Sequence, residues 1–233
     1  MTARAHLESL LRSRKLDVTL TSEAPWDMAT ADKQAFEDRV TTGIASLDSA
    51  LGGGLRRGHL SEIVGARSSG RSAVLCGTLA AAAAGAEAVA LIDTHDRFDP
   101  ASAAAAALDL SRLLWVRETG DAARALKAMN LVLQAGGFGV VAFDLADVPA
   151  PMLRALPFTT WRRISRAIEG SQTAAVLIGA EHIARSPGGV TIAIERLVGG
   201  SPAVWAGGSS RARFLHAIEL RPRVIGARNI ADC

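Results

Sequence analysis

The chain has 233 residues, of which 49% are hydrophobic and 21% charged, a composition that excludes a wholly disordered protein. Mean hydropathy is positive, at +0.21, but short alanine runs supply much of it, and no window offers the roughly 18 strongly apolar residues that a membrane span requires. Two cysteines are too few for a disulfide or zinc framework, and the N-terminus lacks the apolar stretch of a secretory signal. We therefore expect a soluble, cytoplasmic protein.

The charge is distributed unevenly along the chain, whose net charge is +3. Residues 151–233 contain 11 Arg and no Lys against 5 acidic residues, a net charge of +6, so the first 150 residues carry −3. A basic C-terminal third favours a polyanion or an acidic protein surface as partner, because its field attracts anions and speeds association. The alternative is that these arginines only solvate a surface, and the sequence leaves both interpretations open.

The first 40 residues differ in character from the rest. Residues 1–16 are predicted to form a short amphipathic helix, because the leucines are spaced for one face. Residues 17–40 are mixed and polar, as is typical of a linker. The chain is thus expected to divide into an N-terminal segment, 1–40, and a main domain, 41–233.

Within the main domain, short apolar runs alternate with helical segments. Strands are expected at 60–64, 88–93, 113–116, 139–144 and 174–179, and helices at 73–84, 99–108, 121–134 and 161–169. This alternation predicts an α/β fold with a mostly parallel sheet and helices on both faces, since buried parallel strands form continuous apolar runs. The segments 190–198 and 213–224 are predicted to be late strands, in a hairpin or at an antiparallel edge of the sheet.

The segment GARSSGRS, residues 65–72, follows an expected strand and opens an expected helix, the context of a phosphate-binding P-loop. Glycines let the loop amides turn inward, and the helix N-terminus adds its dipole to form an anion cradle. The residues expected to bind phosphate are Gly65, Ser68, Ser69, Gly70, Arg71 and Ser72. Asp144 ends an apolar strand, so Ser72 and Asp144 are the expected ligands of Mg²⁺.

One residue of this loop departs from the P-loop pattern. Position 71 should be Lys, whose compact ammonium reaches the β- and γ-phosphates, and it is Arg. The charge is retained, but the planar guanidinium is bulkier and presents its donors differently. Nucleotide binding is compatible with this change, whereas γ-phosphate chemistry is disfavoured. The alternative is a glycine-rich turn that binds nothing.

The residues that precede the loop strongly resemble the RecA/Rad51 core family. Residues 42–65, TGIASLDSALGGGLRRGHLSEIVG, resemble the lead-in that runs into the P-loop of that family. Residues 91–100, LIDTHDRFDP, resemble its second core strand and the segment that follows. The resemblance covers about residues 40–185. It implies a RecA-like domain, ATP and Mg²⁺ as cofactors, and self-association, for which the helix at 1–16 is a candidate arm.

Four positions depart from the working parts of the family that the chain resembles. The catalytic Glu should fall at His95, the adenine-stacking aromatic at Ser102, and the γ-phosphate-sensing Gln at Ala180. Arg71 in place of Lys is the fourth. Since general-base catalysis supplies about 10²–10⁴ in rate, replacement of the Glu alone leaves little turnover. The resemblance therefore implies a degenerate domain without catalytic residues, in which ATP and Mg²⁺ bind weakly or not at all.

Two phrases, LSEIVGARSSGR at 60–71 and DLSRLLWVRE at 109–118, resemble the ImuA group of bacterial mutagenesis proteins. Its members accompany an inactive Y-family polymerase-like subunit in damage-induced (SOS) translesion synthesis. The resemblance implies an adaptor that binds this polymerase-like partner and also RecA or DNA. The alternatives are an active P-loop ATPase of recombinational DNA repair, with Asp96 or another carboxylate as base, and a DNA-binding module with a vestigial loop.

Two groups of arginines are candidates for contacts with DNA or a protein partner. Arg162, Arg163 and Arg166 follow Trp161 on an expected helix, an arrangement that suits phosphates or single-stranded bases. The alternative is a solvated helix face with the tryptophan packed inward. The second group lies in the late strands, where alternate residues share a face, and consists of Arg211, Arg213, Arg221 and Arg223. No base-reading motif is present, so any DNA binding is expected to be independent of sequence.

Overall fold

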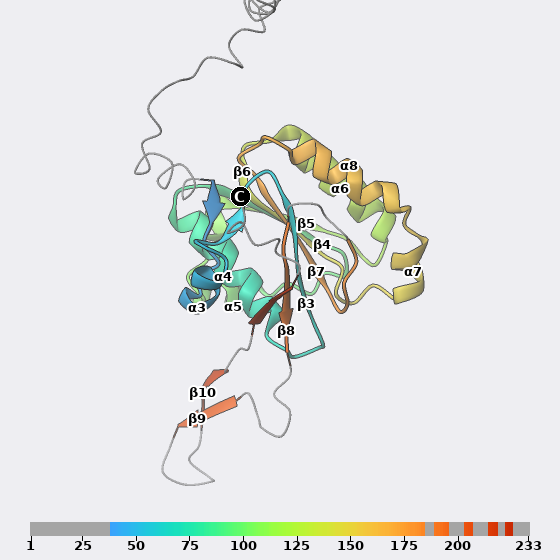
Figure 1. Ribbon diagram of the computed structural model, residues 1–233. Coiled ribbons are helices and arrows are strands. Elements are labelled where there is room, and N and C mark those ends of the chain that lie inside the picture. Colours follow the sequence, from blue (N-terminus) through green and yellow to red (C-terminus); the bar gives the residue numbers. More distant parts are fainter. Residues whose placement is uncertain (1–37, 185–188, 196–202, 207–213, 219–221, 226–233) are drawn as a thin grey trace, which may run out of the picture. The chain divides into compact units, whose positions relative to one another are not determined.

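A sheet of seven strands forms the centre of the protein in the computed structural model, which describes residues 38–184, 189–195, 203–206, 214–218 and 222–225 (Figure 1). Its order is β11-β8-β3-β7-β6-β4-β5. All neighbours are parallel except β11, which pairs antiparallel with β8. The strands are β3 (Leu60–Gly65), β4 (Ala88–Asp93), β5 (Leu113–Arg117), β6 (Phe138–Asp144), β7 (Ala174–Gly179), β8 (Thr191–Ile194) and β11 (Pro222–Ile225).

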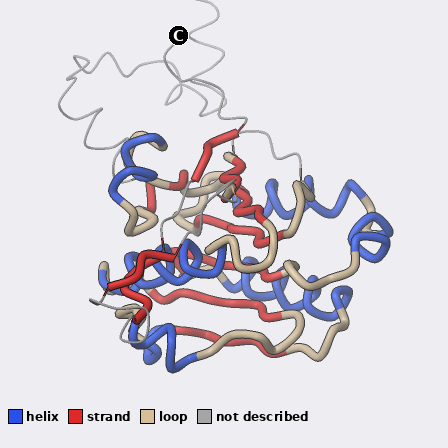
Figure 2. The backbone as a smooth tube through the Cα atoms, turned by 90° about the horizontal axis from the view of Figure 1, so that it is seen from below, coloured by secondary structure: helices blue, strands red, loops and turns tan. Residues whose placement is uncertain are grey.

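Helices cover both faces of this sheet (Figures 1 and 2). On one face lie α3 (Ala45–Ala50), α4 (Arg71–Ala84) and α5 (Pro100–Ala105), and on the other α6 (Ala122–Ala135) and α8 (Phe158–Ile168). The split follows from strand geometry, because successive side chains point to opposite faces. In β6, for example, Val140 and Ala142 belong to the first core and Val141 and Phe143 to the second. The described part also has α7 (Ala150–Ala155) and a 3₁₀ turn (Leu110–Arg112).

The predicted fold class is confirmed, and each strand predicted before residue 180 is present within one residue of its expected ends. The late region is more divided than expected. The segment 213–224 contains two strands, β10 (Phe214–Ile218) and β11, and β10 pairs antiparallel with β9 (Ala203–Ala206) in a sheet of its own. The helix predicted at 1–16 lies outside the described residues. No helix of the described part is long and apolar enough to cross a membrane.

The lead-in before β3 contains short elements that the sequence analysis did not predict. β1 (Arg39–Val40) pairs antiparallel with β2 (Leu55–Arg56), so the chain enters the fold before the expected end of the linker. The Asp48 carboxylate then accepts hydrogen bonds from the amide and hydroxyl of Thr42, both at 2.7 Å. Gly43, at φ +75°, passes so close to α4 that an added Cβ would lie 3.2 Å from the Gly77 carbonyl oxygen. These contacts fix the lead-in against the helix that follows the phosphate loop.

Candidate functional site

The phosphate loop joins the end of β3 to the start of α4, and its backbone conformation depends on small residues. Ser68 and Gly70 both have positive φ, +58° and +97°, and alternating left-handed residues of this kind turn successive amides toward one point. A Cβ added at Gly65 would lie 2.5 Å from the Ser69 hydroxyl oxygen, so the loop folds closely against the strand end. Gly70 is the N-cap of α4 and offers no side-chain cap, which leaves the helix N-terminus open.

The two loop hydroxyls differ in their surroundings. The Ser69 hydroxyl is buried and has no hydrogen-bond partner within the described part of the chain. Ser72, which was predicted to hold Mg²⁺, is exposed on the first turn of α4. Buried polar groups in folded proteins are nearly always paired, so the Ser69 hydroxyl is an exception, and its oxygen packs against Gly65 at the end of β3.

Arg71 turns back into the protein. It is the first residue of α4 and is only 7% exposed. One guanidinium nitrogen, Nη1, donates a hydrogen bond to the Gly65 carbonyl oxygen at 2.5 Å, and the other, Nη2, lies 4.0 Å from Oδ1 of Asp147. The second oxygen of Asp147 lies 3.9 Å from Nε of Arg97, an exposed side chain. Arg71 therefore links the end of β3 to the loop after β6.

Asp144 is the last residue of β6 and pairs with Asp93, the last residue of β4. Its Oδ1 accepts a hydrogen bond from the Ala146 amide at 2.9 Å. Burial raises the pKa of the Asp144 carboxyl above its ordinary 3.8, and repulsion from Asp93 and Asp147 adds to the rise. The Ala146 amide and the positive charge of Arg71 act in the opposite direction on this pKa.

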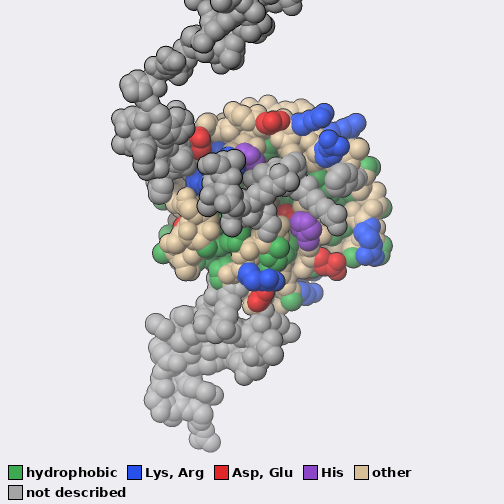
Figure 3. Space-filling model, viewed as in Figure 1, with side chains coloured by type: hydrophobic (Ala, Val, Ile, Leu, Met, Phe, Trp, Pro, Cys, Tyr) green, Lys and Arg blue, Asp and Glu red, His purple; other side chains and the backbone are tan. Residues whose placement is uncertain are grey.

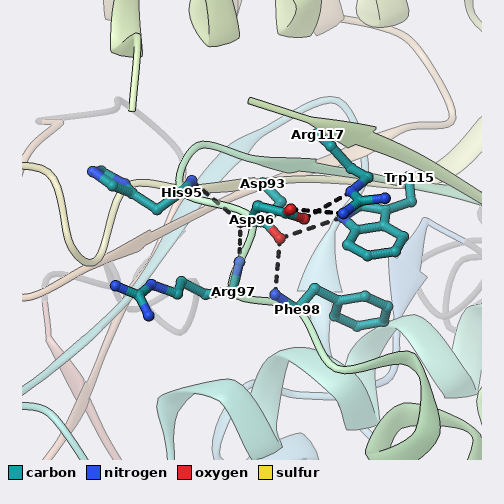
Figure 4. A network of polar contacts seen from close by, with 7 residues as sticks. All are labelled: Asp93, His95, Asp96, Arg97, Phe98, Trp115 and Arg117. Atoms are coloured by element: carbon teal, nitrogen blue, oxygen red, sulfur yellow. Dashed lines mark hydrogen bonds and ion pairs between the residues drawn. The ribbon is translucent and has the colours of Figure 1, made fainter. Parts of the chain in front are cut away.

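The turn after β4, residues 93–98, is built around the Asp93 carboxylate, which is 1% exposed (Figure 4). Its Oδ1 accepts from the amides of His95 and Arg97, at 3.3 and 3.0 Å. Its Oδ2 accepts from the Phe98 amide at 2.8 Å and from the Trp115 indole at 3.3 Å. Both oxygens are thus used to fold the turn, and neither is free for proton transfer.

A second layer of contacts covers this turn. Asp96 receives two hydrogen bonds from Arg117, at 2.7 and 2.6 Å, and these hold the pKa of the Asp96 carboxyl below its usual range. The Arg117 guanidinium lies 4.5 Å from the centre of the Trp115 ring, which also packs edge-on against Phe98 at 5.3 Å. A carboxylate held ionised by arginine is a poor base. These contacts therefore weigh against Asp96 as the general base of an active ATPase.

The remaining positions at which the resemblance implies working residues are His95, Ser102 and Ala180. The His95 ring points away from the Asp93 cluster (Figure 4), and a Cβ on Gly120 would lie 3.7 Å from its Nε2. The Ser102 hydroxyl donates a hydrogen bond to Asp99, the N-cap of α5. Ala180 is exposed just beyond β7. Neither Ser102 nor Ala180 has an aromatic ring that could stack on a base, and Ala180 has no polar side-chain atom.

The three arginines of α8 form an exposed basic surface, which we call the α8 arginine face (Arg162, Arg163 and Arg166). With Thr159 they line a shallow hollow of about 260 Å³, and Lys and Arg side chains gather over α8 in Figure 3. Within the described residues, none of the three forms an ion pair with a carboxylate. Trp161 is 4% exposed and packs inward. It is therefore not available to stack on a base. This inward packing is what the alternative interpretation, a solvated helix face, had predicted for the tryptophan.

The second arginine group is only partly within the described residues. Arg223 lies on β11 and forms an ion pair with Glu195 at 2.5 Å, which balances its charge. The other three members, Arg211, Arg213 and Arg221, lie outside the described part of the chain. In the described structure the α8 arginine face is therefore the stronger candidate for a polyanion contact.

Sequence reasoning missed the acidic residues that organise these loops. Glu62 stands inside an apolar strand and Asp93 at the end of one, and a lone carboxylate in such a run is the signal that could have identified both. Glu62, 1% exposed on β3, accepts hydrogen bonds from the amides of Ile183 and Ala184, at 2.9 and 2.5 Å, and also contacts His182. It thereby fixes the segment that follows β7. Nothing local in the sequence indicates the contacts of Asp147.

Comparisons with known proteins agree with this architecture. The family model "RecA N-terminal domain" matches residues 23–154. Protein RecA of Deinococcus radiodurans is 33% identical over 137 residues, which cover 55% of this chain and 38% of that protein. Protein RecA of Allorhizobium ampelinum is 29% identical over 204 residues, 82% of this chain and 53% of that protein. The matched region thus spans between about a third and a half of the length of these relatives.

A solved structure is similar in fold. The crystal structure of the RadB recombinase superposes with a TM-score of 0.51 over 68% of this chain and 84% of that chain. Sequence identity is 17%, so this likeness concerns the fold alone.

Proposed function

Because this chain belongs to the RecA family, we propose that it is a catalytically degenerate member that serves as an adaptor in DNA-damage-induced translesion synthesis. The family relationship places it among proteins of DNA recombination and repair. Its proposed partners are a Y-family polymerase-like protein, RecA and single-stranded DNA bound without sequence preference. A cytoplasmic location and self-association belong to the same proposal.

The proposal depends on one observation: the carboxylates at the carboxyl end of β4 are already engaged in hydrogen bonds within the protein. Transfer of a phosphoryl group to water needs a side chain that orients or deprotonates the water. The Asp93 carboxylate accepts hydrogen bonds from the backbone amides of the turn, and the Asp96 carboxylate accepts hydrogen bonds from Arg117. The resemblance places His95 at the family's Glu position, and its ring points away from the Asp93 cluster (Figure 4). Efficient ATP-driven strand exchange is therefore not what this site supports.

The phosphate loop is retained as a structural element in this proposal. Gly65, Ser68 and Gly70 shape the backbone, and the N-terminus of α4 has no side-chain cap. These residues support weak binding of a nucleotide phosphate without turnover. A purified chain that hydrolyses ATP at a rate stimulated by DNA would overturn the adaptor proposal in favour of an active repair ATPase. We expect the purified chain, with ATP and DNA, to release no more phosphate than a control without protein.

The α8 arginine face is the proposed contact for an acidic partner or a phosphate backbone. Exposed guanidinium groups without carboxylate partners are suited to phosphate oxygens, because they form bidentate, charge-assisted hydrogen bonds. A triple alanine variant at 162, 163 and 166 tests this. The matched control removes the same charge from α6 and the 3₁₀ turn, by alanine at Arg112, Arg124 and Lys127, which are all exposed.

Two measurements on these variants separate the candidate partners. If the face binds single-stranded DNA, the α8 variant should weaken binding and reduce the salt slope by about 2, at roughly 0.7 per phosphate contact. If it binds the polymerase-like protein, the variant should lose co-purification from damaged cells while DNA binding is unchanged. Equal behaviour of the α8 variant and the control in both assays would contradict a role for this face.

A further inference from the structure

We propose that the α8 arginine face is a docking site for an acidic protein segment that carries one apolar side chain between its carboxylates. The proposal deepens the proposed function, on which it rests, because that function names both single-stranded DNA and a protein as partners of this face. The carboxylates of the segment bind the guanidinium groups, and its apolar side chain fills the hollow between them.

The inner face of α8 is fixed in the protein core. Trp161, Ile164 and Ile168 are buried and belong to the same core cluster. Their packing holds the helix backbone, so the positions from which the arginines leave the helix are set before any partner binds. A surface that is ordered in advance loses less conformational entropy on binding. α8 is therefore a rigid support for a docking site.

The hollow on the outer face of α8 follows from helix geometry. Successive residues of an α-helix are turned by about 100°, so Thr159 and Arg166 lie almost in one line, about 10 Å apart along the helix axis. Arg162 and Arg163 leave the helix on opposite sides of this line. The four side chains line an open space of about 260 Å³, with the smallest of them, Thr159, at one end.

The charge on this surface is unbalanced. α8 contains no Asp or Glu between Phe158 and Ile168, and none of its three arginines forms an ion pair within the described residues. Arginines elsewhere in the described part do lie against carboxylates, as Arg117 does against Asp96 and Arg223 against Glu195. Guanidinium groups bind carboxylates through two parallel hydrogen bonds, so the free arginines of α8 fit an acidic partner.

The hollow favours a protein segment over a nucleic acid. Its walls are mainly carbon atoms of the lining side chains, and such walls gain free energy by covering an apolar group. A cavity of about 150 Å³ is large enough for benzene, so this hollow has room for a leucine or an aromatic side chain. Sites for single-stranded DNA combine positive charge with aromatic rings on which bases stack, and Trp161 of α8 is buried.

The test measures the fluorescence anisotropy of two labelled synthetic peptides titrated with the full chain. Both peptides have three acidic residues on each side of a central residue, which is Leu in one and Ala in the other. Wild type should bind the Leu peptide at least about fivefold more tightly than the Ala peptide, because only the longer side chain fills the hollow. A labelled oligothymidylate is the DNA probe, and at the same salt concentration it should bind more weakly than the Leu peptide.

A variant that fills the hollow tests the apolar contact without a change of charge. Thr159→Trp should remove the preference for the Leu peptide. Its binding of oligothymidylate should stay the same or become tighter, because an added indole can stack on bases. The matched control is Gln134→Trp, which adds the same ring at an exposed position of α6 and should keep the preference.

Removal of the arginines tests the charged rim of the hollow. The triple alanine variant at 162, 163 and 166 should bind both peptides at least about tenfold more weakly, because charge-assisted hydrogen bonds are lost. The control variant with alanine at Arg112, Arg124 and Lys127 should bind them as wild type does. The triple variant also serves as the second test if Thr159→Trp does not fold.

Three outcomes would overturn the docking site. They are equal behaviour of the two peptides with wild type, a Leu preference that survives in Thr159→Trp, and tighter binding of oligothymidylate than of the Leu peptide that the α8 triple variant loses. The third result would assign this face to DNA. All three leave the adaptor proposal standing, because that proposal is judged by ATP turnover. Conversely, DNA-stimulated ATP hydrolysis by a chain that prefers the Leu peptide would refute the adaptor and not the docking site.

Discussion

The phosphate loop and the turn after β4 follow two strands of one parallel sheet that are separated by β7 and β6, and they are organised in different ways. In the phosphate loop the backbone keeps its left-handed residues and open helix N-terminus, while one side chain, Arg71, turns inward. In the β4 turn the carboxylate of Asp93 is surrounded by four donors, and the backbone itself is organised by it. The conformation of the phosphate loop thus depends on its backbone, whereas that of the turn after β4 depends on one buried side chain.

The strongest test of this comparison is Asp93→Ala. The substitution leaves three amides and one indole N–H without their acceptor, and each unsatisfied buried donor costs about 1–3 kcal/mol. We expect the free energy of unfolding in urea to fall by about 3 kcal/mol or more. Asp93→Asn keeps one acceptor oxygen and should lose less. A loss within the roughly 0.5 kcal/mol typical of surface substitutions would show that the turn does not depend on this carboxylate.

A smaller effect is expected at Gly65 in the phosphate loop. In Gly65→Ala the new methyl group meets the Ser69 hydroxyl and side chain, at 2.5 and 3.2 Å. Overpacking of this kind costs about 1–3 kcal/mol, measured again by urea denaturation. The double variant Gly65→Ala with Ser69→Gly removes the main clash and should recover part of the loss. Simple additivity of the two single effects would contradict the close packing of loop on strand.

The next prediction concerns pH and the Asp144 carboxyl. Its pKa in the folded protein is raised above 3.8, so the folded state binds more protons than the unfolded state above that value. Stability contributed by this group is therefore lost as pH rises through the folded pKa. Asp144→Asn should gain stability relative to wild type as pH rises from 3.8, and the gain should then level off. A difference that is independent of pH would show that Asp144 titrates normally.

The smallest effect is expected for the exposed pair of Asp96 and Arg117. The pKa of Asp96 is lowered, so its contribution is present above 3.8 and is lost as pH falls through the folded pKa. Arg117→Ala should lower the melting temperature slightly at neutral pH, and less at high salt, because exposed pairs are screened. An effect as large as that of Asp93→Ala would mean that the outer layer of the turn, and not its buried carboxylate, determines the conformation.

The sequence by itself determined the fold class, the places of the parallel strands and the position of the phosphate loop. Strands buried on both faces produce continuous apolar runs, which local inspection detects. The glycine pattern at 65–70 likewise has a local backbone meaning. The short helix α3, ASLDSA, was not predicted, because Ser and Asp are weak helix formers. The second short helix, α7, is marked only by a proline at its start.

The tertiary structure alone decided which charges meet. Trp115 reaches Asp93 across 22 positions of sequence, and Glu62 reaches Ile183 across 121. Such pairings depend on strand order and on the direction of each side chain, which no local pattern encodes. The inward turn of Arg71 is of the same kind, since its acceptor and its acidic neighbour belong to different strand ends. Local periodicity specifies elements, whereas the fate of a charged group depends on the neighbours that folding brings within reach.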